Sequence, residues 1–434
     1  MDCVAIKNYL LENCLSLFPS GMELSVTEIG RNETDGDGYV NYIYRIAVQN
    51  PDGSISSFIL KHAKPYIKFF GKDAPLPPER NEAEVDINLL RAAIVPQYVP
   101  RILWTDKARH LYITEDWVCG NSCLTIMRFG LGRGARYPYF AAMMGEYIAK
   151  CNFYTSELYL DQGIHKELGR RFTAPEMSRI MEKILFTRET FGGGASGAPV
   201  PEFNGAPYDA VHKQLADSFW EKRDARLKLL CLRDIYMKKT ECLVHGDLHT
   251  SNTLISGSEM KIIDMEYTHL GPFSADLGYL LGNLVYSYAA WFFHTEVDAQ
   301  ERAAFRAEML RMIEGVLREY CRIFRECWER DVKPLFRPYP EYLESLLACC
   351  LRETAQFMGS QIVSRICAMA ETFDFDVLPS RDDRNEARAI CIACGYALLM
   401  QGENVQTPED ITRIIKACAS AYFNADTIPA IPFR

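Results

Sequence analysis

The chain has 434 residues, of which 48% are hydrophobic and 24% charged, and its formal net charge is −9. This length allows two or three folding units with substantial cores. The acidic balance, without a long basic block, argues against nucleic acid as a partner. The most apolar stretches, Leu284–Phe293 and Ala389–Met400, are shorter than the roughly 20 residues that a membrane-spanning helix needs. We therefore expect a soluble protein with no membrane partner.

The N-terminus and the cysteines indicate the compartment. Asp2, Lys7 and Glu12 interrupt the first apolar segment, so it lacks the core of a signal peptide. The 15 cysteines are an odd number in a long chain and form no disulfide framework. The C-x-x-C at 391–394 and the adjacent pair at 349–350 lie in apolar, helical-looking runs, where thiols usually pack as small hydrophobes. We expect a reducing cytoplasm.

The first hundred residues predict a small α+β lobe. Residues 3–18 have the spacing of an amphipathic helix, and Glu79–Ala93 predict a second helix. Alternating or apolar runs separated by Gly, Asp, Asn and Pro turns predict five strands. These runs are Ser25–Ile29, Asn41–Val48, Ser57–Lys61, Arg101–Thr105 and His110–Glu115.

Beyond residue 120 the pattern is mostly helical. We therefore expect a sheet lobe at 1–114, a hinge at 115–119 and a large helical lobe at 120–434 that carries an embedded hairpin. The predicted helices are 137–158, 174–186, 208–238, 301–330, 342–372 and 383–402, and the predicted strands are Cys242–Val244, Thr253–Ile255 and Lys261–Ile263.

Four polar residues beside these late strands have the layout of a phosphoryl-transfer site. Asp247 follows His-Gly at a strand end, and Asn252 stands five residues later. Asp264 and Glu266 follow the next strand at i and i+2, a spacing that places two carboxylates on one face. Such sites use one Asp for the substrate hydroxyl and further oxygens for Mg²⁺. Asp and Asn turns at strand ends are the structural alternative, but this combination of spacings favours the site.

Three further polar residues in the stretch 244–276 each have more than one possible role. His245 acts as a base or, as we favour, orients the loop through backbone hydrogen bonds. His249 contacts the substrate or a phosphate. Asp276 precedes an apolar run, so it caps a helix N-terminus, holds the catalytic loop, or does both.

The first lobe offers a nucleotide-binding side. A Gly-rich turn contains Asp37 and Gly38 and leads to Asn41, although Asp-Gly is also common hairpin chemistry. Lys61 ends an apolar strand, and a Lys on an inner strand face needs an anionic partner. ATP phosphates, or Glu84 or Glu82 on the following helix, supply that partner; an ordinary surface lysine is the alternative. At the end of the fifth strand, Glu115 to Trp117 form a linker whose backbone can read the edge of adenine.

With these residues in place, the chain resembles the protein-kinase-like superfamily and, within it, the methylthioribose kinases, relatives of the aminoglycoside phosphotransferases. The resemblance runs from about residue 24 to about 415. Its most specific motifs are His-Gly-Asp-Leu-His-Thr and an Asp-x-Glu where protein kinases have Asp-Phe-Gly. The matching stretches include Ile59–Lys61, Val99–Arg101, Phe153–Ser156, Leu185–Thr187, His245–Thr250, Ile263–Glu266 and Gly271–Pro272.

The resemblance implies a bilobal kinase fold and roles at matched positions. Asp247 is the implied catalytic base, and Asp247, His249 and Arg365 face the sugar. The implied Mg²⁺ ligands are Asp264 and Glu266, which our reading of the catalytic loop supplements with Asn252. The implied ATP-binding residues are Asp37, Gly38, Asn41, Lys61, Glu84, Glu115, Asp116, Trp117, Asp264, Met265 and Glu266.

The implied reaction is ATP- and Mg²⁺-dependent phosphorylation of the anomeric hydroxyl of 5-methylthioribose in methionine salvage, and the implied assembly is a homodimer. Ser364 replaces the first of two family arginines at 364–365, which bears on the sugar because an arginine fork reads oxygens specifically. About six extra residues lengthen the glycine loop near Arg31–Gly36. A kinase acting on a related ribose, an aminoglycoside or an amino alcohol remains an alternative, as does a non-catalytic nucleotide-binding scaffold.

Overall fold

The computed structural model describes residues 2–19, 21–30, 40–50, 52–118, 124–173, 175–187, 210–369 and 372–424. The predicted nucleotide-binding residues Asp37 and Gly38, with the loop Arg31–Gly36, lie outside these ranges. The chain divides into two compact units: unit 1 is Met1–Phe129 with Ser251–Thr268, and unit 2 is Gly130–Thr250 with His269–Arg434. Unit 1 contains the whole predicted sheet lobe and, in addition, residues 115–129 and 251–268.

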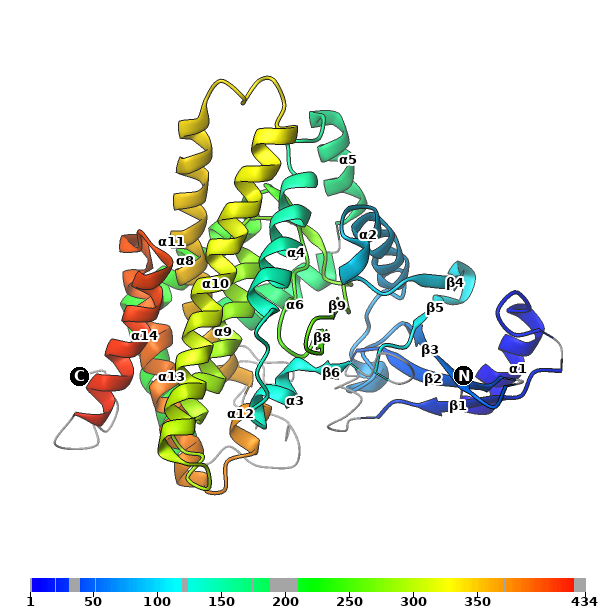
Figure 1. Cartoon of the computed structure of the whole chain (residues 1–434), viewed down its shortest axis with the longest axis horizontal. Coiled ribbons are helices and arrows are strands. Elements are labelled where there is room, and N and C mark those ends of the chain that lie inside the picture. The colour runs from blue at the N-terminus through cyan, green and yellow to red at the C-terminus, as the bar shows by residue number, and fades with distance from the viewer. Residues whose placement is uncertain are drawn as a thin grey trace. The chain divides into compact units, whose positions relative to one another are not determined.

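Unit 1 is built on a five-stranded antiparallel sheet with the strand order β1-β2-β3-β5-β4 (Figure 1). All five strands were predicted, with bounds that differ by at most two residues. The short connections between β2 and β3 and between β4 and β5 fit antiparallel neighbours, which need no long crossover. The strands are β1 Leu24–Glu28, β2 Tyr42–Gln49, β3 Ile55–His62, β4 Ile102–Asp106 and β5 Leu111–Glu115.

Two helices pack against opposite faces of this sheet. Helix α1 (Cys3–Asn13) buries Ile6 and Leu10 in one apolar cluster with Leu60 of β3. The next residue of β3, Lys61, points to the other face, because side chains alternate along a strand, and there it meets α2 (Arg80–Ile94). Helix α1 is shorter than the predicted 3–18, since the chain turns after Asn13.

A second small sheet in unit 1 has the order β6-β8-β9. Strands β8 (Thr253–Ile255) and β9 (Met260–Ile262) form the predicted hairpin, whereas the two-residue β6 (Thr125–Ile126) was not predicted. The hairpin places Asn252 directly before β8 and Asp264 two residues after β9. Helix α3 (Met127–Gly132) follows β6.

Unit 2 is mainly helical, with one small sheet in which β7 (Cys242–Val244) pairs with β10 (His269–Gly271). Among the described residues, the long helices α4, α10 and α11 run side by side in Figure 1. The helices are α4 Phe140–Tyr154, α5 Gln162–Arg171, α6 Pro175–Phe186, α7 Ala210–Trp220, α8 Arg223–Lys238, α9 Ala275–Ala290, α10 Ala299–Asp331, α11 Pro340–Ser364, α12 Phe373–Asp376, α13 Arg381–Gln401 and α14 Pro408–Phe423.

Two predicted helices of unit 2 differ in the structure. The run 208–238 is two helices, because α7 ends at Trp220, whose indole nitrogen donates to the carbonyl of Cys367. The run 342–372 is α11 followed by a π-helical turn at Arg365–Met369. The paired cysteines at 349–350 and 391–394 are free thiols within helices, as predicted. In the described part of the chain, no helix has the length and apolar character to cross a membrane.

Candidate active site

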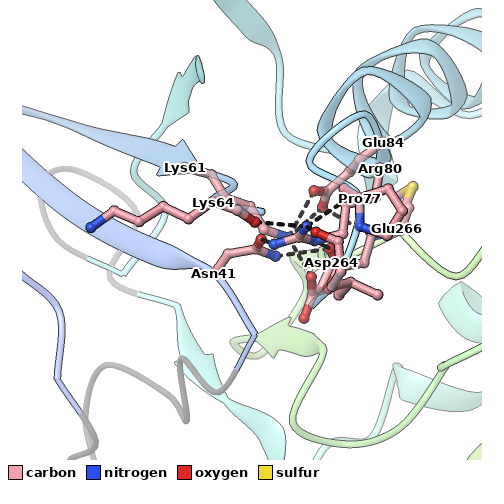
Figure 2. A network of polar contacts seen from close by, with 10 residues as sticks. Asn41, Lys61, Lys64, Pro77, Arg80, Glu84, Asp264 and Glu266 are labelled. Atoms are coloured by element: carbon pink, nitrogen blue, oxygen red, sulfur yellow. Dashed lines mark hydrogen bonds and ion pairs between the residues drawn. The ribbon is translucent and has the colours of Figure 1, made fainter. Parts of the chain in front are cut away.

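Lys61 is the centre of a buried charged cluster in unit 1 (Figure 2). Its Nζ lies 2.8 Å from Oε1 and 2.7 Å from Oε2 of Glu84, and it also pairs with Oδ1 of Asp264. Burial opposes the charged ammonium, but Asp264 and Glu84 together raise the pKa of Lys61 well above its usual range. Lys61 is therefore a cation held on an inner strand face and not a surface lysine. Glu82, the other predicted partner, instead lies near His110.

Glu266 is the second centre of this cluster, and two residues hold it. Asn41 Nδ2 donates to Glu266 Oε2 over 2.9 Å, and Arg80 Nε lies 3.2 Å from the same oxygen. Arg80 also donates from Nη2 to Asn41 Oδ1 over 2.8 Å. All three side chains are buried. The arrangement fixes one oxygen of Glu266 and leaves the other for a different partner.

The local backbone explains how Asp264 and Glu266 reach the cluster. Ile263 N–H donates to the carbonyl of Asn252, which ties the end of β9 to the start of β8. Asp264 then has a φ of 66°, a left-handed conformation that Asp tolerates better than most residues. Met265 N–H donates to Glu84 Oε1 over 3.1 Å. This tight turn directs both carboxylates toward Lys61 and Arg80.

The donor set fits a hard divalent cation. Glu266 Oε1 is buried without a hydrogen-bond partner among the described residues, and burial raises the pKa of Glu266 to about 7. A buried carboxylate oxygen without a partner is costly unless a cation meets it. No group of three or more His, Cys, Asp or Glu side chains in the described ranges forms a metal site by itself. Mg²⁺ commonly takes only one or two carboxylates and completes its shell with water and phosphate oxygens.

The predicted adenine hinge begins at the end of β5. The side chain of Asp116 is fully buried and accepts hydrogen bonds from Arg45 Nε at 2.6 Å and Ser57 Oγ at 2.5 Å. Asp116 therefore anchors the linker to strands β2 and β3. A nucleotide contact by Asp116 would have to come from its backbone.

Trp117, on the same linker, has a hydrogen-bond partner for its indole nitrogen and a cation against its ring face. Its indole nitrogen donates to Glu115 Oε2 over 3.0 Å. The ammonium of Lys261, a buried residue of β9, lies 4.2 Å from the ring centroid. Lys261 also donates to the carbonyl of Val99 over 3.2 Å. A cation below an aromatic face stabilises the orientation of the ring, so Trp117 is held in one position.

The catalytic loop of unit 2 is held by Asp276. Its two carboxylate oxygens accept hydrogen bonds from the backbone N–H of His245, at 2.6 Å, and of Gly246, at 3.0 Å. Gly246 has a φ of 82°, which favours glycine at this turn. The predicted loop-holding role of Asp276 is confirmed, while the helix cap was wrong because Ser274 occupies the N-cap position of α9.

Asp247 lies on this loop between two histidines. The Nδ1 of buried His245 accepts a hydrogen bond from Asp247 N–H at 3.3 Å, which matches the orienting role that we favoured for His245. His249 Nε2 lies 3.5 Å from Asp247 Oδ2. The Asp247 side chain is partly exposed, so it remains accessible to an acceptor substrate.

Arg365 lies in the same unit, at the junction of α11 and its π-helical turn. Its positive charge acts on the hydroxyl groups of Tyr279 and Tyr286, both buried on α9. Ser364, which replaces a family arginine, donates to the carbonyl of Leu185 over 2.7 Å. Serine thus ties α11 to α6 where an arginine would supply a charge.

Two residues of these clusters were not predicted. Arg80 stands one helical turn before Glu84, and i and i+4 share a helix face, so its place on the same face of α2 as Glu84 was readable from the spacing. Tyr279 follows Asp276 by three residues and gave no signal of its own, because aromatic residues in an apolar helix usually belong to the core.

Comparisons with known proteins identify relatives of this chain. Residues 194–318 match the family model of the APH phosphotransferase enzyme family. The methylthioribose kinase of Geobacillus sp. (strain WCH70) is 30% identical over 414 residues, which cover 94% of this chain and 94% of that protein. The methylthioribose kinase of Bacillus pumilus (strain SAFR-032) is 28% identical over 93% of each chain. A crystal structure of choline kinase from Cryptosporidium parvum Iowa II matches with a TM-score of 0.45 at 12% identity, covering 96% of this chain and 100% of that one.

The similarity therefore extends over nearly the whole length of both chains and confirms the resemblance read from the motifs. The five-stranded antiparallel sheet and the helical second unit are those of a kinase-like phosphotransferase fold, as predicted. The chain belongs to the methylthioribose kinase family and is a phosphotransferase that acts on a hydroxyl group.

Proposed function

We propose that the chain transfers the γ-phosphoryl group of ATP to the anomeric hydroxyl of 5-methylthioribose, giving 5-methylthioribose 1-phosphate in methionine salvage. The observation that carries this proposal is the buried cluster of Lys61 with the carboxylates of Glu84, Asp264 and Glu266. Asp264 and Glu266 belong to the Asp-x-Glu motif, which stands in the resembling family where protein kinases have Asp-Phe-Gly. The relatives named methylthioribose kinase support the choice of sugar.

Unit 1 supplies the proposed nucleotide side. Lys61 is held by Glu84 in a position to neutralise phosphate oxygens, which charge-assisted contacts recognise well. Asp264 and Glu266, with the Asn252 amide, would hold Mg²⁺. When bound, Mg²⁺ supplies positive charge to the phosphate oxygens and orients them. Asp264 gives up its ion pair with Lys61 when phosphate takes its place.

Unit 2 supplies the proposed acceptor side. Asp247 accepts a hydrogen bond from the anomeric hydroxyl, aligns its oxygen for attack, and takes its proton as the new P–O bond forms. An anomeric hydroxyl is more acidic than an ordinary alcohol, so alignment contributes more than basicity. A positioned general base typically contributes about 10²–10⁴-fold. His245 and Asp276 fix the loop that presents Asp247.

A non-catalytic scaffold explains the clusters poorly. Burying one lysine against three carboxylates carries a desolvation cost that packing with apolar residues would avoid. Such an arrangement is expected where charge must meet a charged ligand. The intact loop around Asp247 would likewise have no use in a scaffold.

One observation keeps a second acceptor open. Ser364 contributes a hydroxyl that is used within the fold, where the family has an arginine. A sugar that lacks the oxygen read by that arginine, such as another 5-substituted or deoxy ribose, would fit this change. A polycationic aminoglycoside fits less well, because Arg365 places positive charge on the acceptor side.

The family resemblance is the basis for the compartment and the assembly that we propose. We place the protein in the cytoplasm as a homodimer. The described cysteines are all free thiols, and this agrees with a reducing compartment.

A coupled ADP-release assay tests the proposal. The acceptor panel contains 5-methylthioribose, ribose, two other 5-substituted riboses, an aminoglycoside and an amino alcohol. We expect the highest kcat/KM with 5-methylthioribose, and turnover that is lower by about 10²–10⁴-fold in a matched Asp247→Asn preparation. A higher kcat/KM with an aminoglycoside or an amino alcohol would overturn the proposed sugar, and equal turnover in the variant would overturn the assignment of Asp247.

A further inference from the structure

Helix α9 carries a polar stripe although every one of its residues is buried. Asp276, Tyr279 and Asn283 stand at i, i+3 and i+7, which places them on one face of the helix. Burying polar groups is costly unless each has a hydrogen-bond partner. Each of these three residues has at least one partner in the catalytic loop 245–250.

The two ends of the stripe fix the two ends of the loop. At one end, the Asp276 carboxylate accepts from the backbone N–H of His245 and of Gly246. At the other end, Thr250 Oγ1 donates to Asn283 Oδ1 over 3.3 Å. The Asn283 amide in turn donates to the carbonyl one turn before it in α9, so its orientation is set by the helix. The loop is thereby attached at both ends to one rigid element.

Tyr279, in the middle of the stripe, meets the middle of the loop. Burial, the negative charge of Asp247 and a hydrogen bond to its carboxylate raise the pKa of the Tyr279 hydroxyl well above its usual range. Its ring stacks on His249, with centroids 6.1 Å apart and an interplanar angle of 29°. His249 Nε2 lies 3.5 Å from Asp247 Oδ2. Tyrosine and histidine therefore form one packed pair that contacts the same carboxylate.

We propose that Tyr279 is a positioning residue, which holds the Asp247 carboxylate in the orientation that receives the acceptor hydroxyl. This role rests on the proposed function of Asp247. A carboxylate has two oxygens with about four lone-pair sites. The Tyr279 hydroxyl takes one site and restricts rotation of the carboxylate, while the remaining sites serve the acceptor. Because Tyr279 is fixed by burial and by its stack on His249, it transmits the rigidity of α9 to the reacting group.

A tyrosine with a purely structural role would also make a hydrogen bond here, since a buried hydroxyl needs a partner. The two roles differ in what removal of the hydroxyl does. Loss of a structural hydrogen bond lowers stability alone. Loss of a positioning hydrogen bond lowers turnover, because a misplaced catalytic group costs up to about 100-fold in rate.

The test compares Tyr279→Phe with Tyr320→Phe. Tyr320 is an equally buried tyrosine of unit 2 on α10, and its hydroxyl accepts a hydrogen bond of 3.2 Å from Asn152. We expect Tyr279→Phe to lower kcat about tenfold or more, with the KM for ATP unchanged and the acidic limb of the pH–rate profile moved to higher pH. We expect Tyr320→Phe to lower the melting temperature without these kinetic changes. Wild-type kcat and pH profile in Tyr279→Phe would overturn the proposal.

A second measurement does not depend on knowing the acceptor. In a double-mutant cycle of Tyr279→Phe and Asp247→Ala, a direct hydrogen bond makes the two shifts in melting temperature non-additive. Additive shifts would overturn the contact and with it the proposal. If the wild type phosphorylates no sugar while the cycle is non-additive, the proposed function fails and the contact between Tyr279 and Asp247 stands.

Discussion

Asn41 and Glu266, 225 positions apart in the sequence, share a buried hydrogen bond of 2.9 Å. Arg80 contacts both side chains, at 2.8 Å and 3.2 Å. The bond joins the start of β2 to the turn after β9, so the segment 251–268 is locked onto the five-stranded sheet. It also leaves Glu266 Oε1 buried without a partner among the described residues, and this oxygen is where we place the cation.

Lys61→Met leaves the carboxylates of Glu84 and Asp264 without their shared cation. Removing one partner of a buried ion pair typically costs about 3–5 kcal/mol, and the partial exposure of Asp264 places this case at the lower end. We expect the free energy of unfolding in urea to fall by about 3 kcal/mol. In the double variant Lys61→Met/Glu84→Gln, part of that loss is recovered. Unchanged stability in Lys61→Met would mean that the cluster is not held by Lys61.

Asp264→Ala removes one of the two carboxylates assigned to Mg²⁺. We expect the Mg²⁺-dependent part of ATP affinity to disappear, because the remaining ligands cannot hold the ion tightly. Calorimetric titration of ATP with and without Mg²⁺ measures this. The exposed Glu329→Ala, with the same change in charge, serves as the control. Equal Mg²⁺ dependence in the Asp264 variant and in the control contradicts the metal assignment.

Asp247→Asn keeps the shape of the side chain but removes its basicity. We expect kcat to fall by about 10²–10⁴-fold, while the dissociation constant for ATP stays the same, because Asp247 belongs to the acceptor side. Single-turnover kinetics separate the chemical step from product release. Near-normal turnover would exclude Asp247 as the base.

Arg365→Met removes the positive charge beside Tyr279 and Tyr286. If Arg365 reads an oxygen of the sugar, the KM for the sugar rises about tenfold or more, since an unmet polar contact costs at least 1–3 kcal/mol. The KM for ATP should not change. An equal rise in both KM values would point to a general structural effect instead.

His62 gives a pH-dependent contribution to stability. Burial, with the positive charge of Lys64 nearby, lowers the pKa of His62 to about 4, below its ordinary value of 6.5. Between these two values the unfolded chain binds the proton and the folded chain does not, so stability falls as the pH drops from 6.5 toward 4. We expect wild type to lose about 2 kcal/mol more than His62→Gln between pH 7 and pH 5. Parallel losses in urea denaturation at the two pH values would contradict this.

Much of the fold was readable from local sequence signals. The five strands of the first sheet alternate or are apolar and end at turn residues. Lys61 was expected to meet ATP phosphates, Glu84 or Glu82, because a buried lysine needs an anion. Asp247 and Asp264 were placed because each follows a strand. These features depend on residues close in sequence or on a strict chemical requirement.

Other features depend on contacts that no local pattern encodes. Asp276 was expected to cap a helix, but Ser274 is the N-cap residue of α9 and Asp276 lies inside the helix. Its carboxylate instead accepts hydrogen bonds from the backbone of the catalytic loop. Tyr279 looked like core packing, and its position against Asp247 follows only from how α9 and the loop fold together. Asn41 was assigned to ATP, whereas its amide is engaged with Glu266 and Arg80, a contact between residues more than 200 positions apart.

In the proposed reaction, the phosphoryl group of ATP is transferred to the anomeric oxygen of 5-methylthioribose. The most direct measurement is ³¹P and ¹³C NMR of the product formed from ATP, Mg²⁺ and 5-methylthioribose labelled with ¹³C at the anomeric carbon. We expect a new phosphomonoester signal whose phosphorus couples to the labelled carbon, and its absence with Asp247→Asn. A phosphomonoester without that coupling, or release of inorganic phosphate with the sugar unchanged, would contradict the account.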